Sequence, residues 1–367
     1  MSVSDATGPP AASAGAPDLR ALGGRDDVDG ELTRMDLNTG SSEASGLRER
    51  LAEELGDLAL EQYGDERALP LRRTLAALSG RAPDEIFVAN GSMAVLEAIL
   101  ASYGGRGRRA LAFVPSYAGL QRLCHAMDTE LALVARGPRF EIEPGAAEHA
   151  VAEKRPRLVF FCHPNNPTGR PEDAAIVSLA CRLAPQALVV VDEAYVEFCE
   201  ERSMQELTDR PKNLVVVRSL SKAWGLAGAR VGYALADAPI VATLFAGQLP
   251  GVVSAVTQAV ARAALREDPV EQARRINGVR AERTRLARIL RAIPGVQVWP
   301  SSANFLLFRS PGPVGLLLES CAREGILIRD VGDQPGLAGC LRATIATVDA
   351  SDRLGRAVAA VAGGEQV

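Results

Sequence analysis

Short apolar runs separated by helical stretches fill the first two thirds of this chain of 367 residues. These runs have the length of β-strands and lie at residues 86–89, 110–114, 130–134, 158–162, 188–191, 214–217 and 231–235. Strands that are apolar throughout and alternate with helices form mainly parallel sheets that helices cover on both faces. The pattern therefore predicts an α/β domain, which we place at residues 71–250.

The pattern changes after residue 251. A long Arg-rich amphipathic stretch over residues 269–292 leads away from the expected sheet. Further β runs and helical stretches follow at residues 296–299, 304–308, 314–323, 326–329, 340–345 and 351–361. This order predicts a smaller α+β domain over residues 251–367.

The N-terminal part divides near residue 30. Residues 1–30 are rich in Ala, Gly, Pro, Asp and Ser, which predicts a disordered tail. They lack a basic start and a continuous apolar stretch, so no secretory signal is expected. Residues 31–70 carry helical patterns, and we expect this segment to pack against the smaller domain.

Charge and cysteine content exclude several classes of protein. A net charge of −4 gives no electrostatic basis for binding nucleic acid or an anionic membrane, and no apolar run approaches the length of a membrane helix. The six cysteines are scattered without a C-x-x-C spacing, which is typical of reduced thiols in a cytoplasmic protein. The three histidines are too dispersed to predict a metal site.

Polar residues gather just after the predicted strands. They are Gly91, Ser92, Tyr117, Asn166, Asp192, Tyr195, Ser219 and Lys222. Ligands of open α/β sheets bind at the carboxyl ends of the strands. Several unusual residues at one such edge predict a single large ligand.

Lys222 is the centre of this set. Only Lys154, Lys212 and Lys222 are lysines among 41 basic residues, so arginine supplies almost every other positive charge. An amine can lose a proton and attack a carbonyl, whereas a guanidinium cannot. Lys222 lies in the stretch S-L-S-K-A-W-G-L-A-G-A-R-V-G-Y at residues 219–233. This setting favours a reactive lysine over a solvated one.

The residues match a ligand with an aldehyde, a phosphate and a protonatable ring nitrogen. Lys222 supplies the amine for a Schiff base with the aldehyde. Arg230, Gly91, Ser92, Ser219 and Ser221 fit the phosphate. Asp192 can keep the ring nitrogen protonated, Asn166 and Tyr195 can hold a phenolic oxygen, and Tyr117 can stack on the ring. That ligand is pyridoxal 5′-phosphate.

Each residue has a plainer alternative when taken alone. Asn166 in N-N-P-T-G can shape a turn, Asp192 can cap a helix, and a Gly91-Ser92 pair is a common helix start. Specificity comes from the joint pattern.

Five motifs carry a resemblance to a known family. They are C-H-P-N-N-P-T-G (162–169), V-D-E-A-Y-V-E-F (191–198), the Lys222 stretch, S-A-N-F-L-L-F-R (302–309) and G-I-L-I-R-D-V-G-D-Q-P-G-L-A-G-C-L-R (325–342). From about residue 31 onward the chain resembles fold-type-I pyridoxal-phosphate aminotransferases of class I/II. Within this family it most resembles the histidinol-phosphate aminotransferase branch. The resemblance implies a seven-stranded sheet in the large domain.

The resemblance also implies roles for individual residues. Lys222, with Asp192 and Tyr195, is expected to be catalytic and to carry a proton between substrate and cofactor. Tyr63 is expected to reach the cofactor phosphate of a neighbouring subunit, which implies a homodimer. Arg329 and Arg342 are expected to bind the acidic end of the substrate, together with Asn304 of the S-A-N-F motif. The reaction implied is amino transfer from histidinol phosphate to 2-oxoglutarate.

Two departures from the family pattern leave alternatives open. Residues 38–43 stand where the family carries N-E-N-P and an aromatic residue, but they include neither the proline nor the aromatic. Met93 stands where an acidic residue is common. An aminotransferase for another amino acid in specialised metabolism, or a lyase resembling threonine-phosphate decarboxylase, therefore stays open. A catalytically silent binding protein is a third alternative, which the intact set around Lys222 disfavours.

Overall fold

The structure is a computed structural model that describes residues 32–40, 44–207 and 211–363. The predicted disordered tail, residues 1–30, lies outside these described residues. Six free cysteines, all buried, occur in the described ranges. Among those residues, no helix is long and apolar enough to cross a membrane and no cluster of side chains could hold a metal ion.

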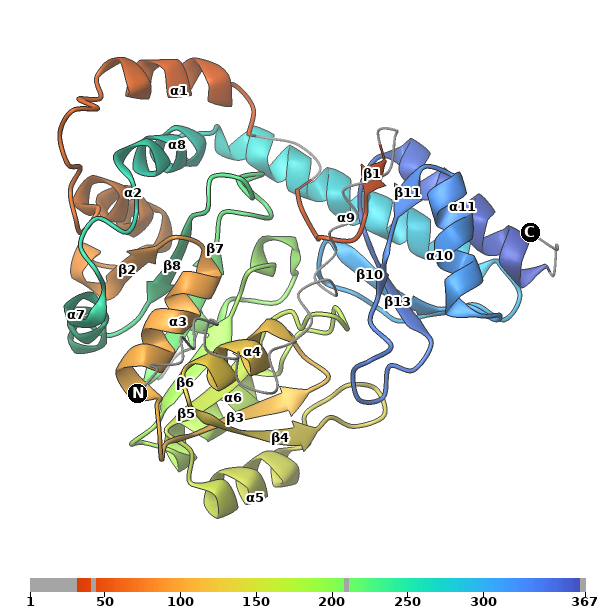
Figure 1. Ribbon diagram of the computed structural model, residues 1–367, viewed down its shortest axis with the longest axis horizontal. Coiled ribbons are helices and arrows are strands. Elements are labelled where there is room, and N and C mark those ends of the chain that lie inside the picture. Colours follow the sequence, from red (N-terminus) through yellow and green to blue (C-terminus); the bar gives the residue numbers. More distant parts are fainter. Residues whose placement is uncertain (1–31, 41–43, 208–210, 364–367) are drawn as a thin grey trace, which may run out of the picture.

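A seven-stranded sheet forms the centre of the larger domain, as expected (Figure 1). Its spatial order is β2 (Ile86–Ala89), β8 (Gly232–Leu235), β7 (Leu214–Ser219), β6 (Leu188–Asp192), β5 (Leu158–Cys162), β3 (Arg109–Val114) and β4 (Glu130–Ala135). Only β8 runs antiparallel to its neighbours, and the pairs from β7 to β4 are parallel. The prediction of a mainly parallel sheet is confirmed.

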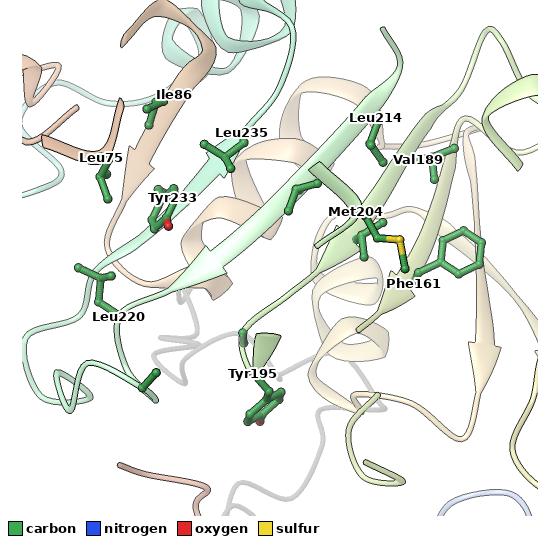
Figure 2. Close-up of a cluster of buried hydrophobic side chains, with 14 of the residues drawn as sticks. Leu75, Ile86, Phe161, Val189, Tyr195, Met204, Leu214, Leu220, Tyr233 and Leu235 are labelled. Atoms are coloured by element: carbon green, nitrogen blue, oxygen red, sulfur yellow. The ribbon is translucent and has the colours of Figure 1, made fainter. Parts of the chain in front are cut away.

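Helices cover both faces of this sheet because alternate strand residues point to opposite sides. Val189 packs in the cluster that includes α2 (Leu69–Ser79), α5 (Pro144–Lys154) and α6 (Ala174–Leu183). The next residue, Val190, packs with α3 (Ser92–Tyr103), α4 (Gly119–Ala126) and α7 (Ala238–Gly247). Figure 2 shows the first cluster, which continues through Tyr195 toward the strand ends.

The smaller domain has its own sheet and its own core. Its four strands lie in the order β12 (Arg329–Asp330), β13 (Cys340–Thr344), β10 (Phe305–Arg309) and β9 (Gln297–Val298). The helices α9 (Pro269–Arg291), α10 (Val314–Arg323) and α11 (Val348–Ala362) pack on it. Figure 1 shows α9 running from the side of the large domain across to this sheet.

One predicted strand is divided in the structure. The run at residues 326–329 contributes to two sheets, because β11 (Ile326–Leu327) pairs with β1 (Thr33–Arg34) and β12 pairs with β13. The β1–β11 pair attaches the start of the described chain to the smaller domain. By contrast α1 (Leu47–Gly56) packs against α8 (Ala255–Leu265), whose alanines lie in the core of the large domain. The domain limits at 70 and 250 stay predictions.

Candidate active site

A cavity of about 460 Å³ lies at the carboxyl edge of the large sheet, where the smaller domain meets it. Most of the predicted site residues line it: Ser92, Tyr117, Asn166, Asp192, Tyr195, Ser219, Ser221, Lys222, Arg230, Arg329 and Arg342. They come from five strand ends and from the smaller domain. The structure therefore brings together residues that are up to 250 positions apart, counted from Ser92 to Arg342.

Lys222 follows β7 and lines the cavity. Its Nζ donates a hydrogen bond to the carbonyl of Leu37 at 3.0 Å and lies 5.7 Å from the centre of the Tyr195 ring. Burial, together with the positive charges of Arg342 and Arg230, lowers the pKa of Lys222 to about 8. A large fraction of this amine is therefore neutral at mildly alkaline pH, as a nucleophile requires.

Asp192 ends β6 on the floor of the cavity. Its Oδ1 accepts a hydrogen bond from the backbone N–H of Ala194 at 3.1 Å. Burial raises the pKa of Asp192 to about 6, and the positive charge of Lys222 opposes that rise. Tyr117 lines the same cavity, and burial followed by the charge of Asp192 raises the pKa of its phenol.

Arg230 and the start of α3 form a cradle at one end of the cavity. Gly91 has a φ of 91°, and a Cβ atom on it would lie 2.6 Å from Arg230 Nη2. A Cβ atom on Gly232 would lie 2.2 Å from the backbone nitrogen of Ser92. Both glycines are therefore required for the helix start and the guanidinium to come this close. Ser219 and Ser221 line the cradle, with the Ser221 N–H donating to Ser219 Oγ at 3.1 Å.

Residues 36–40, called the 36–40 segment below, cross the opposite side of the cavity. The carbonyl of Asp36 accepts a hydrogen bond from Arg342 Nη2 at 2.6 Å, and that of Leu37 accepts from Lys222. A Cβ atom on Gly40 would lie 2.5 Å from the carbonyl oxygen of Lys222. This segment connects β1 of the smaller domain to Lys222. The departure at residues 38–43 lies partly here, and its residues 41–43 are outside the described ranges.

Two arginines of the smaller domain face the cavity side by side. Arg329 on β12 and Arg342 on β13 are direct cross-strand partners. Arg342 Nη1 donates to Asn166 Oδ1 at 2.6 Å, and burial lowers the pKa of the Arg342 guanidinium. Like charges directly opposite each other repel, and the charge of Arg329 also contributes to lowering the pKa of Arg342.

Three predicted residues lie outside the cavity lining. Gly91 shapes the cradle from behind, and Asn304 Nδ2 donates to the carbonyls of Asn38 and Thr39 at 3.2 and 3.3 Å. Asn304 therefore supports the 36–40 segment. Tyr63 is fully exposed, at 103% of the reference area, and does not line this chain's own cavity.

The sequence did not single out two further lining residues. Arg122, on α4, belongs to no motif, and only the fold places it beside Tyr117. Asn38 lies in the stretch that departs from the family pattern, and the sequence predicts no site role for it. The signal that could have identified Asn38 is its position in the N-terminal stretch that aligns with the N-E-N-P segment of the family.

Comparisons with known proteins agree with this geometry. The family model for aminotransferase class I and II matches residues 37–361. The chain belongs to this family. Histidinol-phosphate aminotransferase of Nocardia farcinica is 39% identical over 341 residues, covering 89% of this chain and 87% of that protein.

Solved structures show the same fold. The crystal structure of histidinol-phosphate aminotransferase from Sinorhizobium meliloti in complex with pyridoxal-5′-phosphate has a TM-score of 0.82 at 24% identity, covering 91% of this chain and 92% of that one. L-threonine-O-3-phosphate decarboxylase from Porphyromonas gingivalis has a TM-score of 0.76 at 25% identity, covering 89% and 98%. The predicted fold class, the enzyme class and the pyridoxal-phosphate cofactor of this aminotransferase are confirmed. The roles of individual residues stay predictions.

Proposed function

We propose that this aminotransferase transfers the amino group of histidinol phosphate to 2-oxoglutarate. The observation that carries the substrate assignment is the cross-strand pair of Arg329 and Arg342 facing Lys222 across one cavity. Two guanidiniums at one point suit a dianionic phosphate ester, whereas one bidentate arginine suffices for a carboxylate. The name of the Nocardia farcinica relative supports the same substrate.

The residues of the cavity fit four parts of the cofactor, namely its phosphate, its ring nitrogen, one face of its ring and its phenolic oxygen. Arg230, the hydroxyls of Ser219 and Ser221, and the N–H groups that open α3 would hold its phosphate. Asp192 would hold a proton on its ring nitrogen, and the Tyr117 ring would cover one face. Asn166 and Tyr195 would bind its phenolic oxygen. When bound, the cofactor supplies an aldehyde and an electron-withdrawing ring that make amino transfer possible.

Lys222 supplies both the amine that binds the aldehyde and a mobile proton. Because its pKa is lowered to about 8, its Nζ can take up and release a proton close to neutral pH. The hydrogen bond to the Leu37 carbonyl holds this nitrogen in the cavity. Arg342 and Arg329 would orient the substrate by its acidic end, and Asn304 would contribute indirectly by holding the 36–40 segment.

A second candidate is a decarboxylase that acts on a phosphorylated amino acid. The likeness to the Porphyromonas gingivalis enzyme favours it, because its substrate as named also carries a phosphate. The absence of an aromatic residue in residues 38–43 leaves the organic end of the substrate less enclosed than in the family pattern. The same feature would suit an aminotransferase for another amino acid in specialised metabolism.

A substrate panel separates these candidates. Purified protein with pyridoxal phosphate is incubated with histidinol phosphate, threonine phosphate, histidinol or phenylalanine, each with 2-oxoglutarate. Glutamate formation and carbon dioxide release are followed together. We expect glutamate from histidinol phosphate alone. Carbon dioxide from threonine phosphate would establish the lyase, and preference for phenylalanine would discard the phosphate requirement.

The partner and the cellular location are further proposals. A homodimer is supported by the exposure of Tyr63 and of its neighbour Leu60, since a second subunit would cover both. In that arrangement Tyr63 would complete the site of the neighbouring subunit. A cytoplasmic location, with an amino donor and a 2-oxo acid as the only other partners, stays a prediction.

A further inference from the structure

Asn38 lies beside the catalytic tyrosine, buried to 1% exposure in the 36–40 segment. We propose that Asn38 is a positioning residue that sets the direction in which the Tyr195 hydroxyl donates its proton. This inference rests on the proposed function, because it assigns Tyr195 a place next to the cofactor's phenolic oxygen.

The contacts of Asn38 fix the orientation of its amide. The Asn38 N–H donates to Thr344 Oγ1 at 2.9 Å, so the Thr344 hydroxyl is left to donate its own proton to Asn38 Oδ1, 3.3 Å away. With Oδ1 committed to this bond, the amide nitrogen of Asn38 faces Tyr195. Nδ2 donates to the Tyr195 oxygen at 3.1 Å.

Asn166 is held in the same way on the other side. Its Oδ1 accepts from Arg342 Nη1, and a guanidinium can only donate. Its Nδ2 is therefore turned to the Tyr195 oxygen, at 3.2 Å. Two amide donors thus occupy both acceptor positions of the Tyr195 hydroxyl. The hydroxyl is left as a donor, and its proton points to the cavity.

The backbone of Asn38 restricts which residues can do this. Its φ is 53°, in the left-handed region that Asn, Asp and Gly adopt with least strain. Its carbonyl is held by Asn304 Nδ2. A purely conformational role would be met equally by Asp or Gly, and the amide donor is what distinguishes Asn.

The consequence is chemical. A tyrosine that donates to the cofactor's phenolic oxygen lowers the basicity of that oxygen and of the nitrogen that links the cofactor to Lys222. Asn38→Asp keeps the shape and the backbone but replaces the donor with an acceptor, which draws the Tyr195 proton away from the cavity. Asn38→Gly removes the donor without adding a charge and without straining the backbone.

The test is a pH titration of the visible absorption band of the holoenzyme. Wild type, Tyr195→Phe, Asn38→Asp, Asn38→Gly and the two double variants with Tyr195→Phe are compared, with circular dichroism to confirm folding. We expect the pKa of the band to rise by about 0.5 to 1 in Asn38→Gly and by more in Asn38→Asp, on the scale of losing one hydrogen bond. In the Tyr195→Phe background the Gly effect disappears, and the Asp effect falls to what its charge alone produces.

Two outcomes overturn the inference separately. If Tyr195→Phe raises the pKa of the band and Asn38 variants act equally in both backgrounds, the inference fails while the proposed function stands. If Tyr195→Phe itself leaves the band unchanged, the proposed role of Tyr195 fails, and the role of Asn38 fails with it.

Discussion

The two ends of the cavity are built in different ways. The end proposed to bind the cofactor comes mostly from residues that follow strands of one sheet, so those side chains are placed by the strand before them. The end proposed to bind the substrate comes from the 36–40 segment and from β12 and β13, which are about 300 positions apart in the chain. There the hydrogen bonds of Arg342 to Asp36 and Asn166 join three separate parts of the fold.

Because of this difference, we expect the two ends of the cavity to tolerate single substitutions to different degrees. At the proposed cofactor end, Lys222 and Asp192 each have a task that no neighbour duplicates. At the proposed substrate end Arg329 and Arg342 are cross-strand partners, so the loss of one cation leaves the other in place. Single substitutions of Lys222 and Asp192 should therefore have larger effects than single substitutions of the two arginines.

The largest effect is expected for Lys222→Ala. Without its amine the protein should lose covalently bound, borohydride-reducible cofactor and about 10⁴-fold or more in turnover, since both the nucleophile and the proton carrier are gone. Peptide mass spectrometry after reduction measures the attachment. Lys212→Ala, at an exposed lysine, is the matched control and should behave as wild type. A phosphopyridoxyl-lysine peptide from Lys222→Ala would assign the role to another lysine.

The second-largest effect is expected for Asp192→Asn. An amide cannot stabilise a protonated ring nitrogen as an anion can, so turnover should fall by about 10²-fold or more, the scale of removing a preorganised charge. Cofactor content, measured after alkaline release, should change little because the phosphate cradle is untouched. Near wild-type turnover with a full complement of cofactor would remove Asp192 from the mechanism.

At the substrate end, Arg342→Ala should weaken kcat/KM for histidinol phosphate by about 2–4 kcal/mol, and Arg329→Ala by less. Arg342 also holds Asn166 and the 36–40 segment through two hydrogen bonds, so its loss should disturb more of the site. Steady-state kinetics with Arg323→Ala, an exposed arginine on α10, provide the control. A larger loss for Arg329→Ala would reverse the assignment of the principal substrate contact.

The same difference explains what the sequence could predict. Strand ends follow from apolar runs, so local pattern alone placed Asp192 and Lys222 at one edge of the sheet, whereas Arg230 was assigned from the chemistry of the ligand phosphate. The sequence did not predict that Arg329 and Arg342 are cross-strand partners, because the register depends on the loop between them. It also treated residues 326–329 as one strand, although Ile328 separates two strands of different sheets. Arg122 was missed because a helical arginine carries no local signal.

In the cofactor-free protein, buried Asp192 should lower the free energy of unfolding at neutral pH. Burial raises the pKa of Asp192 to about 6 from an ordinary value of 3.8, so the folded state disfavours its charged form. Protonated Asp192 therefore contributes stability to the fold. This contribution is complete below about pH 4 and is lost as the pH rises through about 6. Cofactor-free Asp192→Asn should therefore be more stable than wild type at pH 7, by up to about 2–3 kcal/mol, and equal to it near pH 4. Urea unfolding at both pH values tests this, and equal stability at pH 7 would contradict it.

The smallest effect is expected for Tyr63→Phe, which removes one hydroxyl from the predicted contact with a neighbouring subunit. The loss of one hydrogen bond to a phosphate should weaken cofactor affinity by roughly threefold to tenfold.

The decisive measurement mixes Tyr63→Phe chains with Lys222→Ala chains and isolates the heterodimer. Its one site with an intact Lys222 takes that lysine from the Tyr63→Phe chain. If Tyr63 acts across the interface, this site receives the unaltered Tyr63 of the other chain and binds cofactor as wild type does. If Tyr63 acts within its own chain, the site shows the full Tyr63→Phe defect. A monomer in solution with full activity would exclude a shared site altogether, and the cofactor end would then be built from one chain alone.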